Sequence, residues 1–203
     1  MKRFGWLVIL ALLLPSAAVA EFRDMKGRWA LGVDLGANVP TGDLGNILKT
    51  GLMAELTGEY YVSNPVSLGA SIQGIFNSIT DSSDRDDPSL NAKIYSFNLY
   101  GRFAYVLNSL APYLIIGGGG YNREVEFFDP LTMGGSTSTV TDQSTRPGAF
   151  GGLGVVFPVS RKVDVLAEGT FTNIFLEDDV ARTFDNHNFV NLKGGIRVVL
   201  GGD

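Results

Sequence analysis

The side chains that most often carry catalysis are scarce in this sequence. It has no Cys and one His among 203 residues, which excludes thiol nucleophiles, disulfide scaffolds, Cys-based zinc sites and His-rich metal sites. The single His lies in Asp185-Asn186-His187-Asn188, a composition typical of a solvated loop. A catalytic triad that uses a histidine could be built only around His187, the one His in the sequence. We therefore expect no catalytic residues, no metal ligands and no cofactor.

Two other motifs could bind a ligand. Four consecutive glycines at 117–120 lack the Lys-Ser/Thr of a phosphate-binding loop and precede no helix, so we interpret them as a bend in a sheet. Asp81, Asp84, Asp86 and Asp87 could hold a divalent cation, but they lack the Gly-centred spacing of a calcium loop. A solvated acidic loop explains these four residues better.

A third set of charged residues stands inside apolar segments rather than between them, always at alternate positions. Its members are Asp34, Glu55, Glu59, Arg102, Glu168, Lys193 and Arg197. Opposite charges buried on one face can form ion pairs. The elements that carry them must therefore place all seven on a common face.

Those elements are strands, because apolar and polar residues alternate with a period of two. From Trp29 to Asn38, for example, one face carries Trp29, Leu31, Val33, Leu35 and Ala37, a separation that a helix would scramble. The same pattern predicts eight strands, over 29–38, 52–60, 66–77, 95–105, 112–122, 148–157, 163–172 and 191–200.

The connections alternate in length. Short turns are predicted at 62–65, 107–111 and 158–162, and long polar loops at 39–50, 78–92, 124–146 and 177–188. Long loops at one end and tight turns at the other are typical of outer-membrane barrels. The fold class predicted is all-β, an eight-stranded antiparallel up-and-down transmembrane β-barrel.

The polarity of the two faces decides which way the barrel is turned. A soluble, lipocalin-like calyx would point its apolar face inward, and eight strands of Trp, Tyr, Phe and Leu would overfill its lumen. Facing those residues to lipid avoids this, and closure satisfies the backbone hydrogen bonds. We expect Tyr60, Tyr61, Tyr105 and Tyr113 to form an interfacial girdle near the short turns.

The N-terminal segment has the features of a signal peptide. Lys2 and Arg3 precede an apolar stretch at 4–14, and Ala18-Val19-Ala20 offers a cleavage site. We predict a signal peptide over 1–20 and a barrel domain over 21–203; a retained anchor is the alternative. Cleavage leaves 14 cations and 21 anions, a net charge of −7, which argues against nucleic acid as a partner.

The long loops are acidic. The segments 78–92, 124–146 and 177–188 each carry a net charge of −3, and together they exceed the charge of the mature chain. Such a rim should repel anionic solutes and attract cations. Our hypothesis is that divalent cations bridge it to lipopolysaccharide phosphates.

Two motifs carry a family resemblance that extends over 29–200. The run GVDLGANVPTGD at 32–43, and Ala-Pro-Tyr-Leu at 111–114 with its Gly-rich continuation, resemble small outer-membrane barrels of the OmpA, OmpX and OmpW type. The resemblance implies an outer-membrane location, a monomer, contact with membrane lipid and lipopolysaccharide, and insertion by the barrel-assembly machinery. Such barrels usually end on an aromatic residue, whereas this sequence ends Val199-Leu200-Gly201-Gly202-Asp203.

Three functions follow from the resemblance. The first is a structural role, or binding through the loops, without catalysis. The second is a conduit for small hydrophobic molecules like that of OmpW, which a lateral opening near the Gly-rich strands would favour. The third is a lipid A-modifying enzyme; a deacylase needs His, Ser and Glu together, but Phe189 stands two residues after His187.

Loop lengths give a first register for the lumen. Pairing Asn38 near Gly51 places Asp34 opposite Glu55, so a cation must lie between these like charges, and Lys193 is the candidate.

Two further pairs follow from the same reasoning. Pairing Phe175 near Val190 places Glu168 opposite Arg197. The small Ser67 lets Arg102 reach Glu59 over the ~10 Å of two strand spacings. We therefore expect a lumen closed by these ion pairs.

Overall fold

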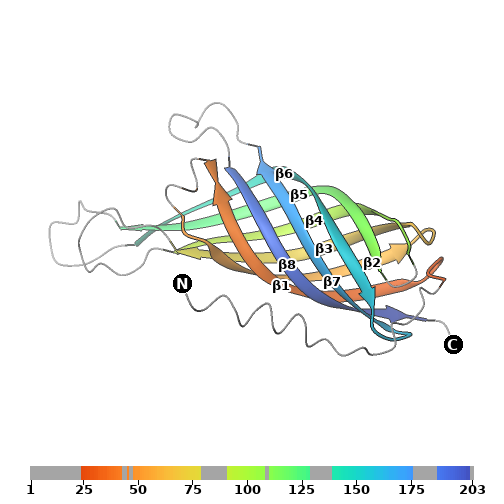
Figure 1. Cartoon of the computed structure of the whole chain (residues 1–203). Coiled ribbons are helices and arrows are strands. Elements are labelled where there is room, and N and C mark those ends of the chain that lie inside the picture. Colours follow the sequence, from red (N-terminus) through yellow and green to blue (C-terminus); the bar gives the residue numbers. More distant parts are fainter. Residues whose placement is uncertain are drawn as a thin grey trace, which may run out of the picture.

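The computed structural model describes residues 24–42, 45, 48–78, 91–107, 110–128, 139–175 and 187–201. Its strands are β1 (Trp29–Thr41), β2 (Gly51–Tyr61), β3 (Val66–Ser78), β4 (Asn91–Ala104), β5 (Ala111–Phe128), β6 (Thr139–Pro158), β7 (Val163–Ile174) and β8 (His187–Leu200). They form one closed barrel in sequence order, with every neighbouring pair antiparallel (Figure 1). The predicted eight-stranded up-and-down barrel is confirmed. In the part of the chain that is described, no helix has the length and apolarity needed to cross a membrane.

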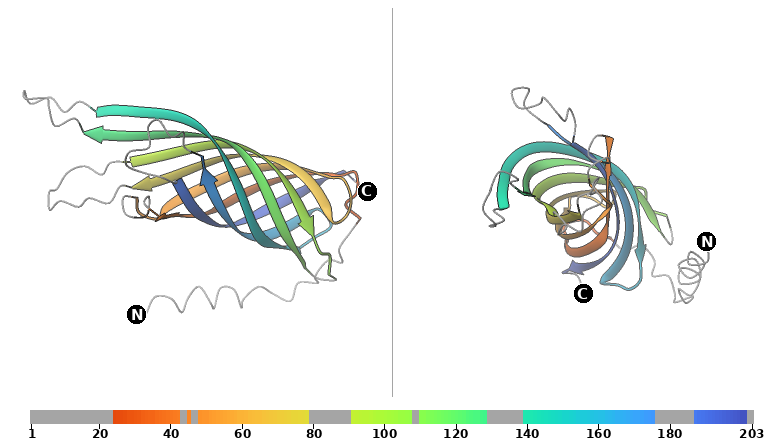
Figure 2. Two further views of the ribbon diagram at one scale, coloured as in Figure 1. Left: turned by 90° about the horizontal axis from the view of Figure 1, so that it is seen from above. Right: turned by 90° about the vertical axis from the view of Figure 1, so that its left-hand side faces the viewer.

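Strands β5 and β6 are longer than the alternation predicts. They pair out to Phe128 and Thr139, so the loop predicted over 124–146 is wrong at both ends. Outside the membrane a strand no longer needs an apolar face, and its alternation ends before its pairing does. Figure 2 shows these two strands running past the ends of their neighbours. We call residues 121–128 and 139–146 the ribbon.

The two faces of the wall have opposite polarity. Outward side chains are apolar and exposed, as in Leu35 (65%) and Leu52 (73%), whereas acids, amides and hydroxyls are buried inside. A soluble calyx would show the inverse arrangement. An outer wall of this kind is stable only in lipid.

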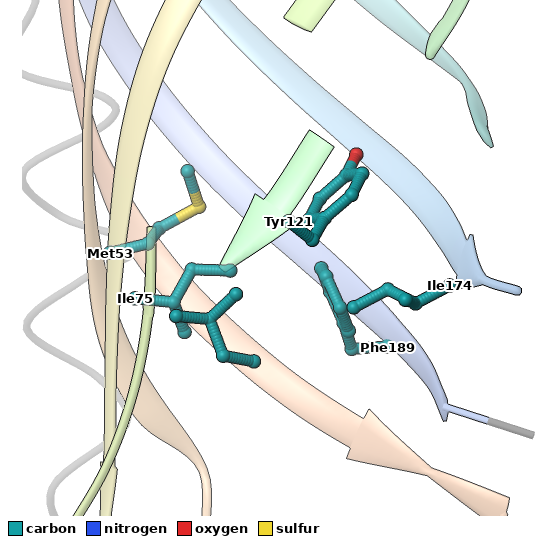
Figure 3. Packing of buried hydrophobic residues seen from close by; sticks show 6 residues of the cluster. Met53, Ile75, Tyr121, Ile174 and Phe189 are labelled. Atoms are coloured by element: carbon teal, nitrogen blue, oxygen red, sulfur yellow. The ribbon is translucent and has the colours of Figure 1, made fainter. Parts of the chain in front are cut away.

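Three apolar clusters lie inside the wall. Near the short turns, Met25 packs with Ala30, Tyr61 and Val199. A second cluster contains Tyr100, Tyr113, Ile115, Val156 and Leu166. Near the long loops, a third comprises Met53, Ile75, Ile94, Tyr121, Ile174 and Phe189, which come together from six strands (Figure 3). We call this third cluster the outer plug.

The predicted tyrosine girdle is half wrong. Tyr60 and Tyr105 do face outward, and Tyr60 packs on Trp29 with ring centroids 5.1 Å apart. Tyr61 and Tyr113 are buried, at 8% and 3% exposure. Successive residues of a strand point to opposite faces, so Tyr60 and Tyr61 cannot both face lipid.

The Gly-rich part of β5 lets the wall close tightly. A Cβ built at Gly117 would lie 2.5 Å from the Leu99 carbonyl oxygen, and one at Gly119 would lie 2.0 Å from that of Phe97. Only glycine fits so close to the β4 backbone. The β4–β5 and β5–β6 ladders both continue through this region without interruption.

Candidate functional site

The structure places all seven predicted charged residues on the lumen side of the wall. Six are almost completely buried, and the Lys193 side chain is 6% exposed. Their positions follow from strand alternation: Glu55 and Glu59 share one face of β2, as Lys193 and Arg197 share one face of β8. Asp164 joins them, which brings the buried charges described here to five acids and three bases.

Arg102 is the centre of this charge network. Its guanidinium forms an ion pair with Glu59, and its Nη2 lies 3.2 Å from Glu168 Oε2. Arg197 Nη1 approaches Glu59 from the other side, 3.2 Å from Oε2. Ser67 lies directly opposite Arg102 on β3, where its small side chain leaves the route to Glu59 open.

Lys193 extends the network toward the long loops. Its Nζ pairs with Glu55 and lies 2.8 Å from Glu168 Oε1, so Glu168 joins Lys193 to Arg102. Asp34 lies opposite Glu55, as the loop lengths predict. Its Oδ1 has no hydrogen-bond partner among the described residues, and a Cβ at Gly195 would come within 1.7 Å of it.

The predicted pairing of Glu168 with Arg197 is wrong. Glu168 lies opposite Lys193, and Arg197 lies opposite Asp164. The predicted register is displaced by four residues. A shift by an even number leaves every side chain on its own face, so alternation cannot detect the error.

Two tyrosines that the sequence analysis did not assign to the network also belong to it. The Tyr100 hydroxyl donates to Glu59 Oε1 at 2.9 Å, and the Tyr113 hydroxyl donates to Glu168 Oε2 at 2.8 Å. The Arg102 guanidinium lies 4.3 Å from the centroid of the Tyr113 ring, a cation–π distance. Tyr100 is two residues before Arg102, so the alternation that placed Arg102 could have found it.

Tyr61 and Asp164 could have been found in the same way. Arg197 Nη1 donates to the Tyr61 hydroxyl oxygen at 3.1 Å. Tyr61 is two residues from Glu59, and Asp164 is four from Glu168. Interpreting Tyr61 as part of a girdle concealed its place in the lumen.

Both ends of the lumen are closed. Beneath the outer plug, Asn38 donates to Asn191 at 2.7 Å and accepts from Asn77 at 3.1 Å. At the other end, the Met25 N–H donates to Asn64 Oδ1 at 2.8 Å and holds the Met25 side chain over the opening. A cavity of about 20 Å³ remains below Met25, room for about one water molecule.

Part of the ribbon extends beyond its neighbouring strands: β5 pairs with β4 as far as Val125, whereas β6 from 139 to 147 has no pairing with β7. The β6–β7 pairing ends where Ile174 meets Gly148, with a last hydrogen bond from the Phe175 N–H to the Pro147 carbonyl at 2.9 Å. From 139 to 146, β6 pairs with β5 and has no second strand among the described residues. Pro147, which has no N–H to donate, marks the start of this open edge.

Several other predicted sites lie outside the residues that the structure describes. The four aspartates at 81–87 and most of the acidic loops are outside the described residues, as is the His187 side chain. Over the described ranges, no group of three or more His, Asp or Glu side chains could hold a metal ion.

Comparison with known proteins agrees with this architecture. Residues 7–193 match the family described as outer membrane protein beta-barrel domain. A search of curated proteins found no match. The match begins inside 1–20, so the signal peptide and its boundary remain a prediction.

Several solved structures share the fold. Neisserial surface protein A is 20% identical, with 84% of this chain and 96% of that chain covered and a TM-score of 0.61. Ail from Yersinia pestis is 13% identical (87% and 100% covered, TM-score 0.53), and OprG from Pseudomonas aeruginosa is 12% identical (90% and 100% covered, TM-score 0.52). Together, the family match over most of the sequence and the closed barrel with its apolar outer wall establish that this chain belongs to the outer membrane protein β-barrel family and lies in the outer membrane.

Proposed function

We propose that the protein is a non-catalytic, non-conducting anchor that presents the ribbon as a binding surface outside the membrane. The observation that carries this proposal is the edge of β6 at 139–146, which among the described residues is paired on one side only, with β5. Such an edge is a template on which another extended chain can add a strand.

The backbone geometry identifies the groups that would receive the partner. In an antiparallel strand, the N–H and C=O of one residue point to the same side. The Pro147 carbonyl points toward β7, so the odd-numbered residues of the ribbon's β6 segment present their backbone groups to the open side. Thr145 and Gln143 are therefore the first positions at which a partner strand would pair.

The filled lumen supports an anchoring role. The outer plug, the charge network and Met25 occupy successive levels of the interior. Ion pairs across the barrel, such as Arg102–Glu168 and Lys193–Glu55, join strands that are not neighbours. The base from which the ribbon projects is therefore stiff, which lowers the entropy lost on binding.

A single backbone change tests the edge. Thr145→Pro removes one N–H from the open side and spares the ladder to β5, whereas Thr145→Val keeps that N–H and serves as the control. Peptides selected from a displayed library on the nanodisc-embedded protein should be extended. They should bind Thr145→Pro at least about fivefold more weakly, the effect of one lost hydrogen bond, and bind Thr145→Val normally. Equal binding to both variants would contradict strand addition.

Two alternatives predict different measurements. A conduit for small hydrophobic molecules would speed their entry into proteoliposomes, but the unbroken ladders around 117–120 give it no support. A lipid A-modifying enzyme would release product from lipid A and lose this activity in His187→Ala. We expect neither flux nor product.

A further inference from the structure

The lipid-facing wall formed by β7, β8 and β1 contains an apolar groove of about 1080 Å³. Its lining includes Leu31 and Val33 of β1, Ile196 and Leu200 of β8, Val165 of β7 and Leu56 of β2. Gly194 lies at the floor, where the missing side chain deepens the groove. The three strands lie side by side on the front of the barrel in Figure 1.

The groove lies in the half of the membrane next to the short turns. Leu200 pairs with Trp29 at the turn end of the seam between β8 and β1. From Leu200 to Gly194 the strand rises by about 20 Å, which at a tilt of ~40° is about 15 Å along the membrane normal. That is half of a hydrocarbon core of ~30 Å. Short turns face the periplasm, so the groove spans the periplasmic leaflet.

Cations gather at the mouth of this groove. Arg28 immediately precedes β1, and its Nη1 donates to the Gly201 carbonyl at 3.4 Å. Lys162 immediately precedes β7, and its carbonyl accepts the Val199 N–H at 2.8 Å. The two basic residues therefore flank the end of β8 on its two sides. Arg161, also exposed, adjoins Lys162.

This basic group stands out against the rest of the molecule. The chain as a whole has a net charge of −5. The described residues of the other two short turns, 62–65, 105–107 and 110, carry no charge. Lys26 and Asp24 are the other charged residues of the described segment before β1, and the Lys26 N–H donates to Asn64 Oδ1 in the β2–β3 turn at 3.2 Å. Among the described residues at this end of the barrel, Arg28, Arg161 and Lys162 thus place positive charge beside the end of β8, where the groove opens.

We propose that the groove and this basic rim bind one phospholipid of the periplasmic leaflet that carries an anionic headgroup. An acyl chain lies along β8 from Leu200 to Gly194, and the phosphate lies between Arg28 and Lys162. Lipopolysaccharide does not fit because it occupies the opposite leaflet. A second copy of the chain would bring another basic rim against this one, and the like charges would repel.

Native mass spectrometry of the detergent-purified protein tests the headgroup, with phosphatidylglycerol and phosphatidylcholine added separately. We expect phosphatidylglycerol to bind more tightly. Arg28→Gln and Lys162→Gln should each weaken its binding about fivefold, and the double variant about 25-fold. Lys49→Gln, an exposed cation at the loop end, should leave it unchanged. Equal binding of the two lipids, or an equal loss in Lys49→Gln, would overturn the proposal.

Filling the floor tests the acyl site. A Cβ at Gly194 meets nothing closer than the Leu166 carbonyl oxygen at 3.6 Å, so Gly194→Leu should fold and occupy the groove. Gly101→Leu on β4 is the matched control, because a Cβ there lies 3.8 Å from its nearest neighbour. Gel shifts on heating verify folding of both variants. Retention of phosphatidylglycerol by Gly194→Leu, or a dimer that this change disrupts, would overturn the proposal.

Discussion

Within the lumen, glycines and tyrosines are matched residue by residue. Tyr100 lies opposite Gly69, and Tyr113 lies opposite Gly154. A Cβ at Gly69 would lie 2.4 Å from Tyr100 Cζ, and one at Gly154 would lie 2.3 Å from Tyr113 Cζ. Each ring therefore covers a glycine of the next strand, which leaves its hydroxyl free to reach a carboxylate. The glycines are needed for the position of the rings.

Gly69→Ala should consequently damage the charge network without touching a charge. The added methyl group displaces Tyr100 and breaks its hydrogen bond to Glu59, which should cost about 1–3 kcal/mol of unfolding free energy. Urea unfolding in lipid vesicles measures this cost. Gly101→Ala, where space is open, is the control. Equal stability of the two variants would show that the ring has room to move.

Arg102 is the residue whose loss should cost most. Arg102→Ala removes one of the two cationic partners of Glu59 and one of the two of Glu168, and the added excess of buried negative charge should cost about 3–5 kcal/mol. Adding Glu59→Ala should recover part of that loss, with a coupling energy of about 0.5–3 kcal/mol. The four unfolding curves of a double-mutant cycle measure the coupling. Strictly additive losses would mean that Arg102 and Glu59 are not energetic partners.

At the scale of elements, the predicted register of β7 against β8 differs from the observed one. Eight strands, and the faces of Asp34, Glu59 and Arg102, follow from a period of two alone. Register does not, because a displacement by four residues keeps all faces unchanged. Loop length is the one remaining criterion in the sequence, and a long connection such as that between β7 and β8 is compatible with both registers.

The alternation does not predict the ends of β5 and β6 for a related reason. A period of two marks a strand only while one face is buried or in lipid, and residues 126–128 of β5 and 139–146 of β6 run past the ends of β4 and β7. The backbone pairing between β5 and β6 continues there, although the sequence no longer alternates between apolar and polar residues. The closure of the lumen by Met25 could likewise not be predicted, because a short segment before the first strand carries no periodicity.

Engineered cysteines distinguish the two registers of β7 and β8, and the chain has no native Cys to interfere. Phe171 lies opposite Val190, at a separation that a disulfide can span. Phe171→Cys with Val190→Cys should therefore oxidise readily. In the register estimated from loop length, Phe171 would instead face Gly194, about 13 Å further along β8. The second pair to be tested is therefore Phe171→Cys with Gly194→Cys. Thiol labelling followed by mass spectrometry detects the disulfide in either pair. Cross-linking of the Phe171–Gly194 pair alone would contradict the structure.

The whole molecule is a barrel whose interior is occupied at every level, from Met25 to the outer plug. Reconstituted into planar bilayers, it should show no steady ion conductance. Water and ions would have to pass the apolar side chains of the outer plug, which exclude them by dewetting. Phe189→Ser with Ile174→Ser should admit a small current if the plug is the barrier. The current should favour cations, because acids outnumber bases in the lumen below. Steady conductance of the unmodified protein would contradict a closed lumen.

The distribution of lumen charges along the chain has a consequence for biogenesis. Of the buried charges described, the five acids lie on β1, β2 and β7, whereas two of the three bases, Lys193 and Arg197, lie on β8. A folding intermediate that lacks only its last strand therefore holds five carboxylates against one guanidinium, that of Arg102. Such an interior must stay hydrated, since dehydrating unpaired carboxylates is prohibitive. Docking of β8 adds two of the three bases and halves the net charge of the described interior, from −4 to −2, in the same step that completes the ladder. Expulsion of water and closure of the wall therefore become a single late event.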